Sequence, residues 1–336
     1  MGLLAFLHRV LEAPTAAVRA GLRSSAFGGC LTATSTAILL STGIGNAQPG
    51  SVDTSLQFGP ASASFTTLFA VGALPDGKIL VSGNFTSIEG YFRDGFARLN
   101  SDGSVDLDFA ASPGFAPSRI LVQRDGRFFL QSGRTLHRYS PDGSRDTNFN
   151  ISPPMSANST IQDVLLQPDG LLLVVGSVKR EGETDAEFRG LRWFDSDGSW
   201  DTNFDSLVRS AQSAFVQTNR QILVGGDFSV PWPGGGTRSY IIRLNPDGTV
   251  DTSFDPGTGP DNYVSFVWGQ PDGKVVISGN FSRVRDYARD EIARFNPDGT
   301  LDSTVSLAWA RRVDGCVAQP DGKLVVRTPG YQEGVR

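Results

Sequence analysis

The chain has 336 residues and a formal net charge of −5, which allows one large β-domain or two average domains. Its Lys and Arg residues are scattered, so it lacks the basic patch expected of a nucleic-acid-binding protein. The 39 Gly and 19 Pro are accompanied by 22 Phe, so they predict turns between core strands rather than disorder. With only two His and two Cys, the chain offers little material for histidine-based acid–base or zinc chemistry.

Residues 1–47 have the layout of a secretory signal peptide. A basic region precedes a short apolar run, Thr36–Ile44, and small residues follow up to Ala47. This order predicts export with cleavage after Ala47, and the apolar run is short for a membrane span. An uncleaved anchor is the alternative. A lipoprotein site at Cys30 is disfavoured because the apolar run follows this residue instead of preceding it. The basic residues are Arg9, Arg19 and Arg23.

Two short stretches recur along the rest of the chain with a period of about 50 residues. The first-turn stretch reads QPDGKVVISGNF at 270–281, and the second-turn stretch reads NPDGTVDTSF at 245–254. Each predicts a β-hairpin, because Pro and Asp suit the central turn positions and Gly supplies a positive φ. The turn glycines include Gly77, Gly103, Gly273 and Gly299.

Two hairpins per period predict units of four short antiparallel strands. The run after the first turn is apolar on both faces, which indicates a strand covered on both sides. This is the pattern of a β-propeller blade, so we predict an all-β fold with a propeller domain over 48–336. About six blades are expected, the last one incomplete. The repeat units lie near 50–109, 110–149, 150–204, 205–254, 255–305 and, in part, 306–336.

These motifs resemble the bacterial delta-60 repeat, a family of secreted and surface proteins with propeller repeats. The resemblance covers residues 48–336 and implies a propeller and an exported location, without a particular reaction. Two first-turn stretches depart from the pattern. The one at Gln217 reads QTNRQILVGGDF and has lost its Pro and Gly, and the one at Gln123 reads QRDGRFFLQSG. We expect looser turns at both.

The Asp after each second turn is the most regular polar position. A calcium loop is one interpretation, but the EF-hand spacing with a distal Glu is absent. The favoured interpretation is structural: an Asx-type turn in which the carboxylate accepts nearby backbone N–H groups. These residues are Asp53, Asp106, Asp146, Asp201, Asp251 and Asp302.

An Arg recurs near the end of the expected third strand. A set of such cations could bind an anionic ligand, but we favour pairing with an acidic side chain of the same blade or covering of an aromatic ring. The third repeat carries Trp193 at this position, which fits the structural interpretation. The arginines are Arg98, Arg138, Arg243 and Arg294.

The least repetitive segments connect the second and third strands, and variable loops on a regular scaffold are common recognition sites. Of these segments, 229–239 gives the candidate binding loop with Trp232, Arg238 and Tyr240. We predict a non-catalytic secreted or surface module for protein or glycan, without cofactor, metal, nucleic acid or membrane insertion after leader removal. It would be a monomer or part of a longer chain. The alternative is a propeller hydrolase or lyase with a metal in the central channel.

The C-terminal sequence leads into a further strand. Residues 331–336 align with 91–97, which precede an expected third strand. The N-terminal copy around Val52 would then lack its neighbour. We therefore expect five whole blades and a partial sixth, belonging to a longer protein.

Overall fold

The computed structural model describes residues 68–109, 111–151, 154–184 and 188–304, and the backbone of 315–318 and 324–327. Every regular element in this part is a β-strand, which confirms the all-β prediction. None of the described segments forms a helix of the length and apolarity needed to cross a membrane. The predicted leader and the copy around Val52 lie outside the described residues, as does most of the predicted last repeat.

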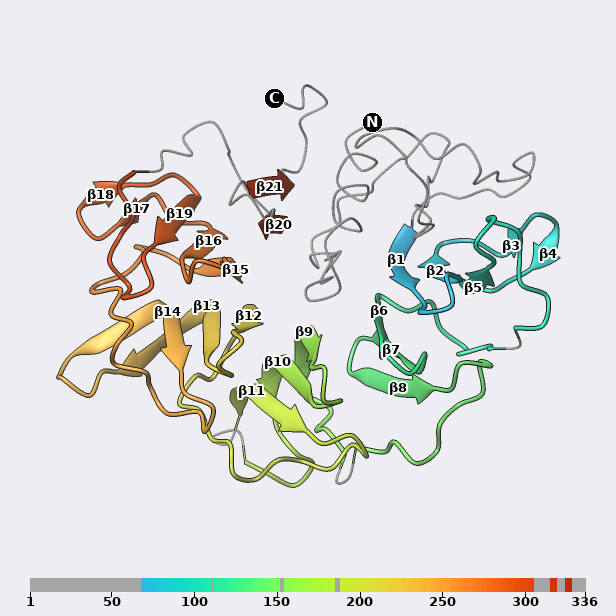
Figure 1. Cartoon of the computed structure of the whole chain (residues 1–336). Helices are drawn as coiled ribbons and strands as arrows, with labels where there is room; N and C mark the ends of the chain where they lie inside the picture. The colour runs from blue at the N-terminus through green and yellow to red at the C-terminus, as the bar shows by residue number, and fades with distance from the viewer. Residues whose placement is uncertain are drawn as a thin grey trace. The chain divides into compact units, whose positions relative to one another are not determined.

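The described part of the chain divides into two compact units, one that ends at Phe149 and one that begins at Asn150. The first unit contains two three-stranded antiparallel sheets, of orders β1-β2-β5 and β6-β7-β8, and the small hairpin β3–β4 (Figure 1). The strands are β1 (Leu68–Ala73), β2 (Ile79–Gly83), β3 (Ser87–Ile88), β4 (Tyr91–Phe92), β5 (Phe96–Leu99), β6 (Arg119–Val122), β7 (Phe128–Ser132) and β8 (Thr135–Tyr139).

The second unit contains three further three-stranded sheets, of orders β11-β10-β9, β12-β13-β14 and β15-β16-β19. Two hairpins accompany them, β17–β18 and β20–β21. The strands are β9 (Thr160–Leu166), β10 (Leu172–Val178), β11 (Arg189–Phe194), β12 (Ser213–Val216), β13 (Ile222–Pro231), β14 (Thr237–Leu244), β15 (Val264–Gly269), β16 (Val275–Gly279), β17 (Arg283–Val284), β18 (Tyr287–Ala288), β19 (Ile292–Phe295), β20 (Gly315–Ala318) and β21 (Leu324–Arg327).

The middle strand of each sheet supplies two hydrophobic cores. Alternate residues of a strand point to opposite faces. In β13, Ile222 and Val224 pack into the core shared with the third repeat, whereas Leu223 packs into the core shared with the fifth. In the first unit, Leu80 of β2 likewise shares a core with Phe128 of the second repeat. Packing on both faces explains why the run after each first turn is apolar throughout.

The fourth strand of each repeat is shorter than predicted. After the second turn the chain makes one isolated bridge to the third strand, such as Leu244 to Val250, instead of a continuous ladder. One more backbone bond follows, from Asp251 N to Arg243 O at 2.9 Å. The Asp251 carboxylate then accepts the Ser253 N–H at 2.9 Å, so the backbone turns away before a ladder can continue. Each described repeat is therefore three strands and a bridge.

The turn at Gln217 is not loose, so that expectation was wrong. Its bonds, Arg220 N to Gln217 O at 2.9 Å and Gln217 N to Gln221 O at 2.8 Å, match those of the Gly273 turn at 3.0 and 2.7 Å. Arg220 takes a φ of 67° where Gly273 has 81°. The turn at Gln123 keeps the same two bonds, at 3.1 and 2.8 Å. The backbone pattern therefore survives the loss of the usual residues.

The connection 229–239 is a hairpin extension rather than an irregular loop. Strands β13 and β14 stay paired through Val230 and Arg238 up to Pro231 and Thr237. Val230 is buried, which holds the extension against the core. The turn at its tip is closed by two backbone hydrogen bonds, from Trp232 N to Gly236 O and from Gly235 N to Trp232 O. In the first and fifth repeats the same connection forms the separate hairpins β3–β4 and β17–β18.

Candidate functional site

In the first, second, fourth and fifth repeats, the Asp after the second turn forms an ion pair with the Arg of the third strand. The Arg Nε lies 2.7 Å from Asp106 Oδ2 in the first repeat and 2.6 Å from Asp251 Oδ2 in the fourth. The other Asp oxygen caps the backbone two residues on, as in the Asx-type turn that we expected. The pairs in the second and fifth repeats are Arg138–Asp146 at 2.8 Å and Arg294–Asp302 at 2.8 Å.

These arginines also cover aromatic rings. The guanidinium carbon of Arg98 lies 4.2 Å from the centroid of Phe109, and that of Arg243 lies 5.0 Å from the centroid of Phe254. Arg243 also donates from Nη1 to the carbonyl of Pro297, in the second turn of the next repeat, at 2.9 Å. Arg98 and Arg243 thus each join carboxylate, aromatic core and neighbouring repeat, as the structural interpretation requires.

A second donor binds the same carboxylate in three repeats. Lys78 Nζ lies 2.7 Å from Asp106 Oδ2, Lys274 Nζ lies 2.9 Å from Asp302 Oδ2, and Gln221 Nε2 lies 2.7 Å from Asp251 Oδ2. These donors follow the first turn of their own repeat. Burial opposes ionisation of these Asp side chains, but the hydrogen bonds and cations outweigh it and lower the pKa of all three.

The third repeat breaks this arrangement. Trp193 takes the place of the Arg and Leu171 that of the Lys, and both belong to or contact the hydrophobic core. The Trp193 ring packs edge-on against Phe204, with 6.4 Å between centroids, where the first, second and fourth repeats use a guanidinium. Asp201 Oδ1 still accepts the Asn203 N–H at 2.8 Å. In the described part of the chain, however, no Lys or Arg pairs with the Asp201 carboxylate.

The same repeat forms a charged pocket of about 210 Å³. Three guanidinium groups and three carboxylates line it. Arg180 Nε lies 2.7 Å from Glu183 Oε1, and Arg189 Nε lies 2.6 Å from Asp205 Oδ1. Arg192 Nη2 lies 3.5 Å from Glu183 Oε2. The lining comprises Arg180, Glu183, Arg189, Arg192, Trp200, Asp201, Thr202, Phe204 and Asp205.

The predicted loop residues Trp232, Arg238 and Tyr240 lie on the hairpin β13–β14, at its tip or in its strands. Arg238 stacks over Trp232, 4.5 Å from guanidinium carbon to ring centroid, and forms a two-bond pair with Asp255 at 2.7 and 3.0 Å. Tyr240 is half-buried against the core of the fifth repeat. The structure therefore groups Trp232 with Arg238 and turns Tyr240 inward.

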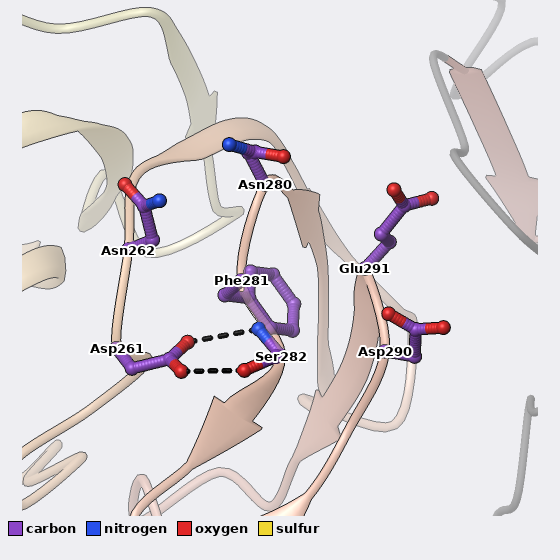
Figure 2. Close-up of a pocket in the computed structure, with 7 residues that line it drawn as sticks. All are labelled: Asp261, Asn262, Asn280, Phe281, Ser282, Asp290 and Glu291. Atoms are coloured by element: carbon purple, nitrogen blue, oxygen red, sulfur yellow. Dashed lines mark hydrogen bonds between the residues drawn. The ribbon is translucent and has the colours of Figure 1, made fainter.

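A second pocket, of about 200 Å³, lies in the fifth repeat (Figure 2). Asp261 accepts from Ser282 N at 2.9 Å and from Ser282 Oγ at 2.7 Å, which fixes one wall. In Figure 2, Asn262 lies on the same side as Asp261, Asp290 and Glu291 lie on the opposite side, and Asn280 lies between the two sides. Within the described residues no group of three or more His, Cys, Asp or Glu side chains is arranged to hold a metal ion.

Aromatic side chains are exposed on the short hairpins of the first and fifth repeats. Tyr91 and Phe92 of β4 are 45% and 72% exposed, and Tyr287 of β18 is 55% exposed. Tyr91 and Tyr287 occupy the same place in their repeats, as the alignment of the two hairpins shows. Sequence analysis pointed to these connections but not to these residues.

The pocket of the third repeat was also missed. Its arginines lie on the variable connection between the second and third strands and on the third strand itself, so no shared motif marked them. A signal was nevertheless present: Leu171 and Trp193 replace the two cations that surround the Asp in the first and fifth repeats. Simultaneous loss of both partners of one carboxylate would have singled out the third repeat.

The folded repeats and their turn motifs define a β-propeller-type repeat protein. The family model described as "Domain of unknown function (DUF5122) beta-propeller" matches three segments, in the first, fourth and fifth repeats. These are residues 74–109, 217–254 and 270–304. Each segment runs from a first turn to the end of the second-turn stretch, so the model and the repeat defined above describe the same unit. No curated protein matches the chain significantly.

Several solved structures are similar to this chain at low identity. PorZ of Porphyromonas gingivalis, described as an essential bacterial surface component of the type-IX secretion system, is 11% identical with a TM-score of 0.48; the match covers 79% of this chain and 38% of PorZ. The WD40 β-propeller domain of Doa1 is 12% identical, with a TM-score of 0.46 and coverage of 79% and 90%. XC5397 from Xanthomonas campestris, a gluconolactonase, is 14% identical, with a TM-score of 0.43 and coverage of 79% and 84%.

Proposed function

We propose that this protein is an exported, non-catalytic binding module that recognises a protein or glycan through the connections between its second and third strands. The observation that carries the proposal is the exposure of Tyr91, Phe92 and Tyr287 on those connections. Tyrosine and other aromatic residues are enriched at recognition surfaces because they offer large contact areas at low conformational cost. Trp232, covered by Arg238, adds an aromatic side chain on the corresponding connection of the fourth repeat.

The repeated charged residues support a structural rather than a catalytic role. A general acid or base needs a side chain that can reach a substrate. The carboxylates of Asp106, Asp251 and Asp302 are instead buried and bound by cations or backbone N–H groups. Their hydrogen bonds serve the turns, and the variable connections remain the natural place for binding.

The binding proposal is tested with the exported protein on arrays of purified surface glycans and proteins. We expect a saturable ligand whose affinity falls about tenfold or more in Phe92→Ala or Tyr287→Ala, as for aromatic residues central to an interface. Leu107→Ala, which removes an exposed apolar side chain outside these connections, is the matched control. The proposal would be contradicted if the ligand bound all variants of the connections with unchanged affinity, or if the protein turned over a substrate at the array surface.

Export is tested separately on the full-length protein. The order of basic, apolar and small residues in 1–47 supports cleavage after Ala47. Mass spectrometry of the exported protein should find Gln48, or its cyclised form, at the N-terminus. A mature protein that still carries Arg9 would contradict this part.

A further inference from the structure

A second Arg recurs at the end of the connection between the second and third strands. In the fourth repeat it is Arg238, whose Nε and Nη2 donate to the two Asp255 oxygens at 2.7 and 3.0 Å. The Asp255 side chain is 46% exposed, so this edge of the guanidinium holds a carboxylate at the protein surface. Arg189, one position further along in the third repeat, binds Asp205 through the same two nitrogens at 2.6 and 3.5 Å.

Arg93 occupies this position in the first repeat, but no carboxylate binds it. Its Nη1 donates to the carbonyl of the preceding residue at 2.9 Å, as Arg238 Nη1 does at 3.1 Å. Its Nη2 reaches only the Asp106 backbone carbonyl, at 3.4 Å, and its Nε is buried without a hydrogen-bond partner. Among the described residues, therefore, no acidic side chain forms an ion pair with Arg93.

The missing partner has a counterpart in the sequence. Asp255 follows Phe254 at the end of the second-turn stretch, whereas Ala110, which lies outside the described residues, follows Phe109. The fifth repeat also has no Asp at this place, and the Nε of its Arg289 is again buried and unpartnered. The Nε of this Arg is thus paired where the chain supplies an Asp and unpaired where it does not.

The geometry points to a carboxylate from outside the chain: we propose that Arg93 binds an Asp or Glu side chain of a partner protein, in the place that Asp255 takes on Arg238. A buried charged donor without an acceptor is unfavourable, and a carboxylate that accepts from both Nε and Nη2 removes this cost in a charge-assisted two-bond pair. Because Nε is covered in the free protein, the connection must shift slightly to admit both oxygens. The inference rests on the proposed function and deepens it, since it names the group that the first repeat recognises.

The neighbouring side chains favour a protein over an acidic glycan. Tyr91 and Phe92 directly precede Arg93 and are 45% and 72% exposed. They stand on the hairpin β3–β4 and line neither of the two pockets described above, so a partner surface has to spread over them to bury them. Aromatic residues and Arg are the residue types that contribute most to such interfaces. Asp94, next in the chain, is exposed, so a simple anion gains less than a carboxylate flanked by apolar side chains.

The inference is tested by titrating the exported full-length protein with the tripeptides Leu-Asp-Leu and Leu-Asn-Leu, acetylated and amidated at their ends, while NMR follows the Arg Nε–H signals. We expect the Asp peptide to bind about tenfold or more tightly than the Asn peptide and to shift the Arg93 signal. Arg93→Gln should remove this preference, and Phe92→Ala should weaken binding of both peptides. The Arg238 signal is the internal control and should not respond, because Asp255 already occupies its guanidinium. D-glucuronate, which carries its carboxylate on a sugar ring, should bind more weakly than the Asp peptide.

Two further variants exchange the states of the first and fourth repeats. Ala110→Asp gives the first repeat the carboxylate that the fourth repeat has, so it should abolish the preference for the Asp peptide. Asp255→Ala removes the carboxylate from Arg238, whose Nε–H signal should then respond to the Asp peptide. Circular dichroism and thermal unfolding show whether each variant keeps the fold.

Three results would overturn the inference: equal binding of the two peptides, a preference that persists in Arg93→Gln or in Ala110→Asp, and tighter binding of D-glucuronate than of the Asp peptide. Array ligands that depend on Phe92 or Tyr287 and bind Arg93→Gln with unchanged affinity would in that case leave the proposed function standing. The two failures are therefore distinguishable.

Discussion

The third and fourth repeats share one hydrophobic core but treat the same carboxylate in opposite ways. In the fourth repeat Asp251 is buried and held by Arg243 at 2.6 Å and Gln221 at 2.7 Å. In the third repeat Trp193 and Leu171 extend the apolar core, and Asp201 keeps only its backbone contact in the described structure. Both repeats have the same three strands and the same bridge after the second turn.

The difference shows that the ion pair is not what builds the blade. The third repeat keeps the same backbone hydrogen bond as the fourth: Asp201 N lies 3.0 Å from Trp193 O, and Asp251 N lies 2.9 Å from Arg243 O. Burying an apolar side chain is often as favourable as burying an ion pair, because the pair must lose its water. A repeat that replaces Arg by Trp can therefore keep its fold and release a carboxylate for another role.

The largest expected effect comes from neutralising the paired carboxylate. Asp251→Asn leaves the buried Arg243 without its counter-charge and should destabilise the protein by about 3 kcal/mol. Asp201→Asn removes no cation pair and should stay within about 0.5 kcal/mol. Urea unfolding followed by fluorescence compares the two variants. Equal losses of stability would mean that the carboxylates of Asp201 and Asp251 play the same role in their repeats.

The second expected effect is a loss of stability at the contact between the third and fourth repeats. An ideal Cβ at Gly248 would lie 2.4 Å from the carbonyl oxygen of Asp205, and its φ is 90°. Gly248→Ala should therefore cost about 2–3 kcal/mol, from backbone strain and displacement of residue 205. At Gly273 the nearest atom would lie 3.2 Å away, on the Pro297 side chain, so Gly273→Ala should cost only about 1 kcal/mol. Thermal unfolding gives both values, and a reversed order would refute the steric account.

Acid should reduce the difference in unfolding free energy between the wild type and Asp251→Asn. Burial of Asp251 opposes its ionisation, yet the hydrogen bonds from Ser253 and the charge of Arg243 lower its pKa overall. A carboxyl with a lowered pKa stabilises the folded state above the unfolded Asp value of about 3.9, and this stabilisation is lost as pH falls further. The difference in unfolding free energy should therefore be full at pH 7 and narrow below about pH 4. A constant difference across this range would contradict the assignment.

The smallest expected effect is an increase in stability. Arg220 holds a φ of 67° in the first turn of the fourth repeat, where the third repeat has Gly170 at 90°. Arg220→Gly should stabilise the fold by about 0.5–1 kcal/mol, because Gly adopts this conformation without steric cost. The exposed pair of Arg220 with Asp169, at 3.3 Å, contributes little against this gain. Chemical denaturation checks the sign, and Arg220→Ala, which loses the same pair but keeps the strain, is the control.

The sequence by itself determined the repeat, because its signals are local. Pro-Asp-Gly sets each turn through the backbone preferences of adjacent residues. The apolar run after the first turn requires cover on both faces, as Ile222 and Leu223 show by packing into different cores. The pairing of Arg with Asp could also be anticipated, since Arg243 and Asp251 lie eight residues apart on facing sides of one hairpin.

Only the tertiary structure decided how long each strand is and which side chains from separate segments come into contact. The fourth strand ends after one bridge because the Asp251 carboxylate accepts the Ser253 N–H, which a longer strand would use for pairing. Side-chain and strand hydrogen bonds compete for this N–H, and the residue pattern alone does not tell which of them forms. The pocket joins Arg180, Arg189 and Asp201 from three stretches of the third repeat. Their meeting depends on where β10 and β11 end and how the chain between and after them folds back, and no local preference specifies such side-chain contacts between separate segments.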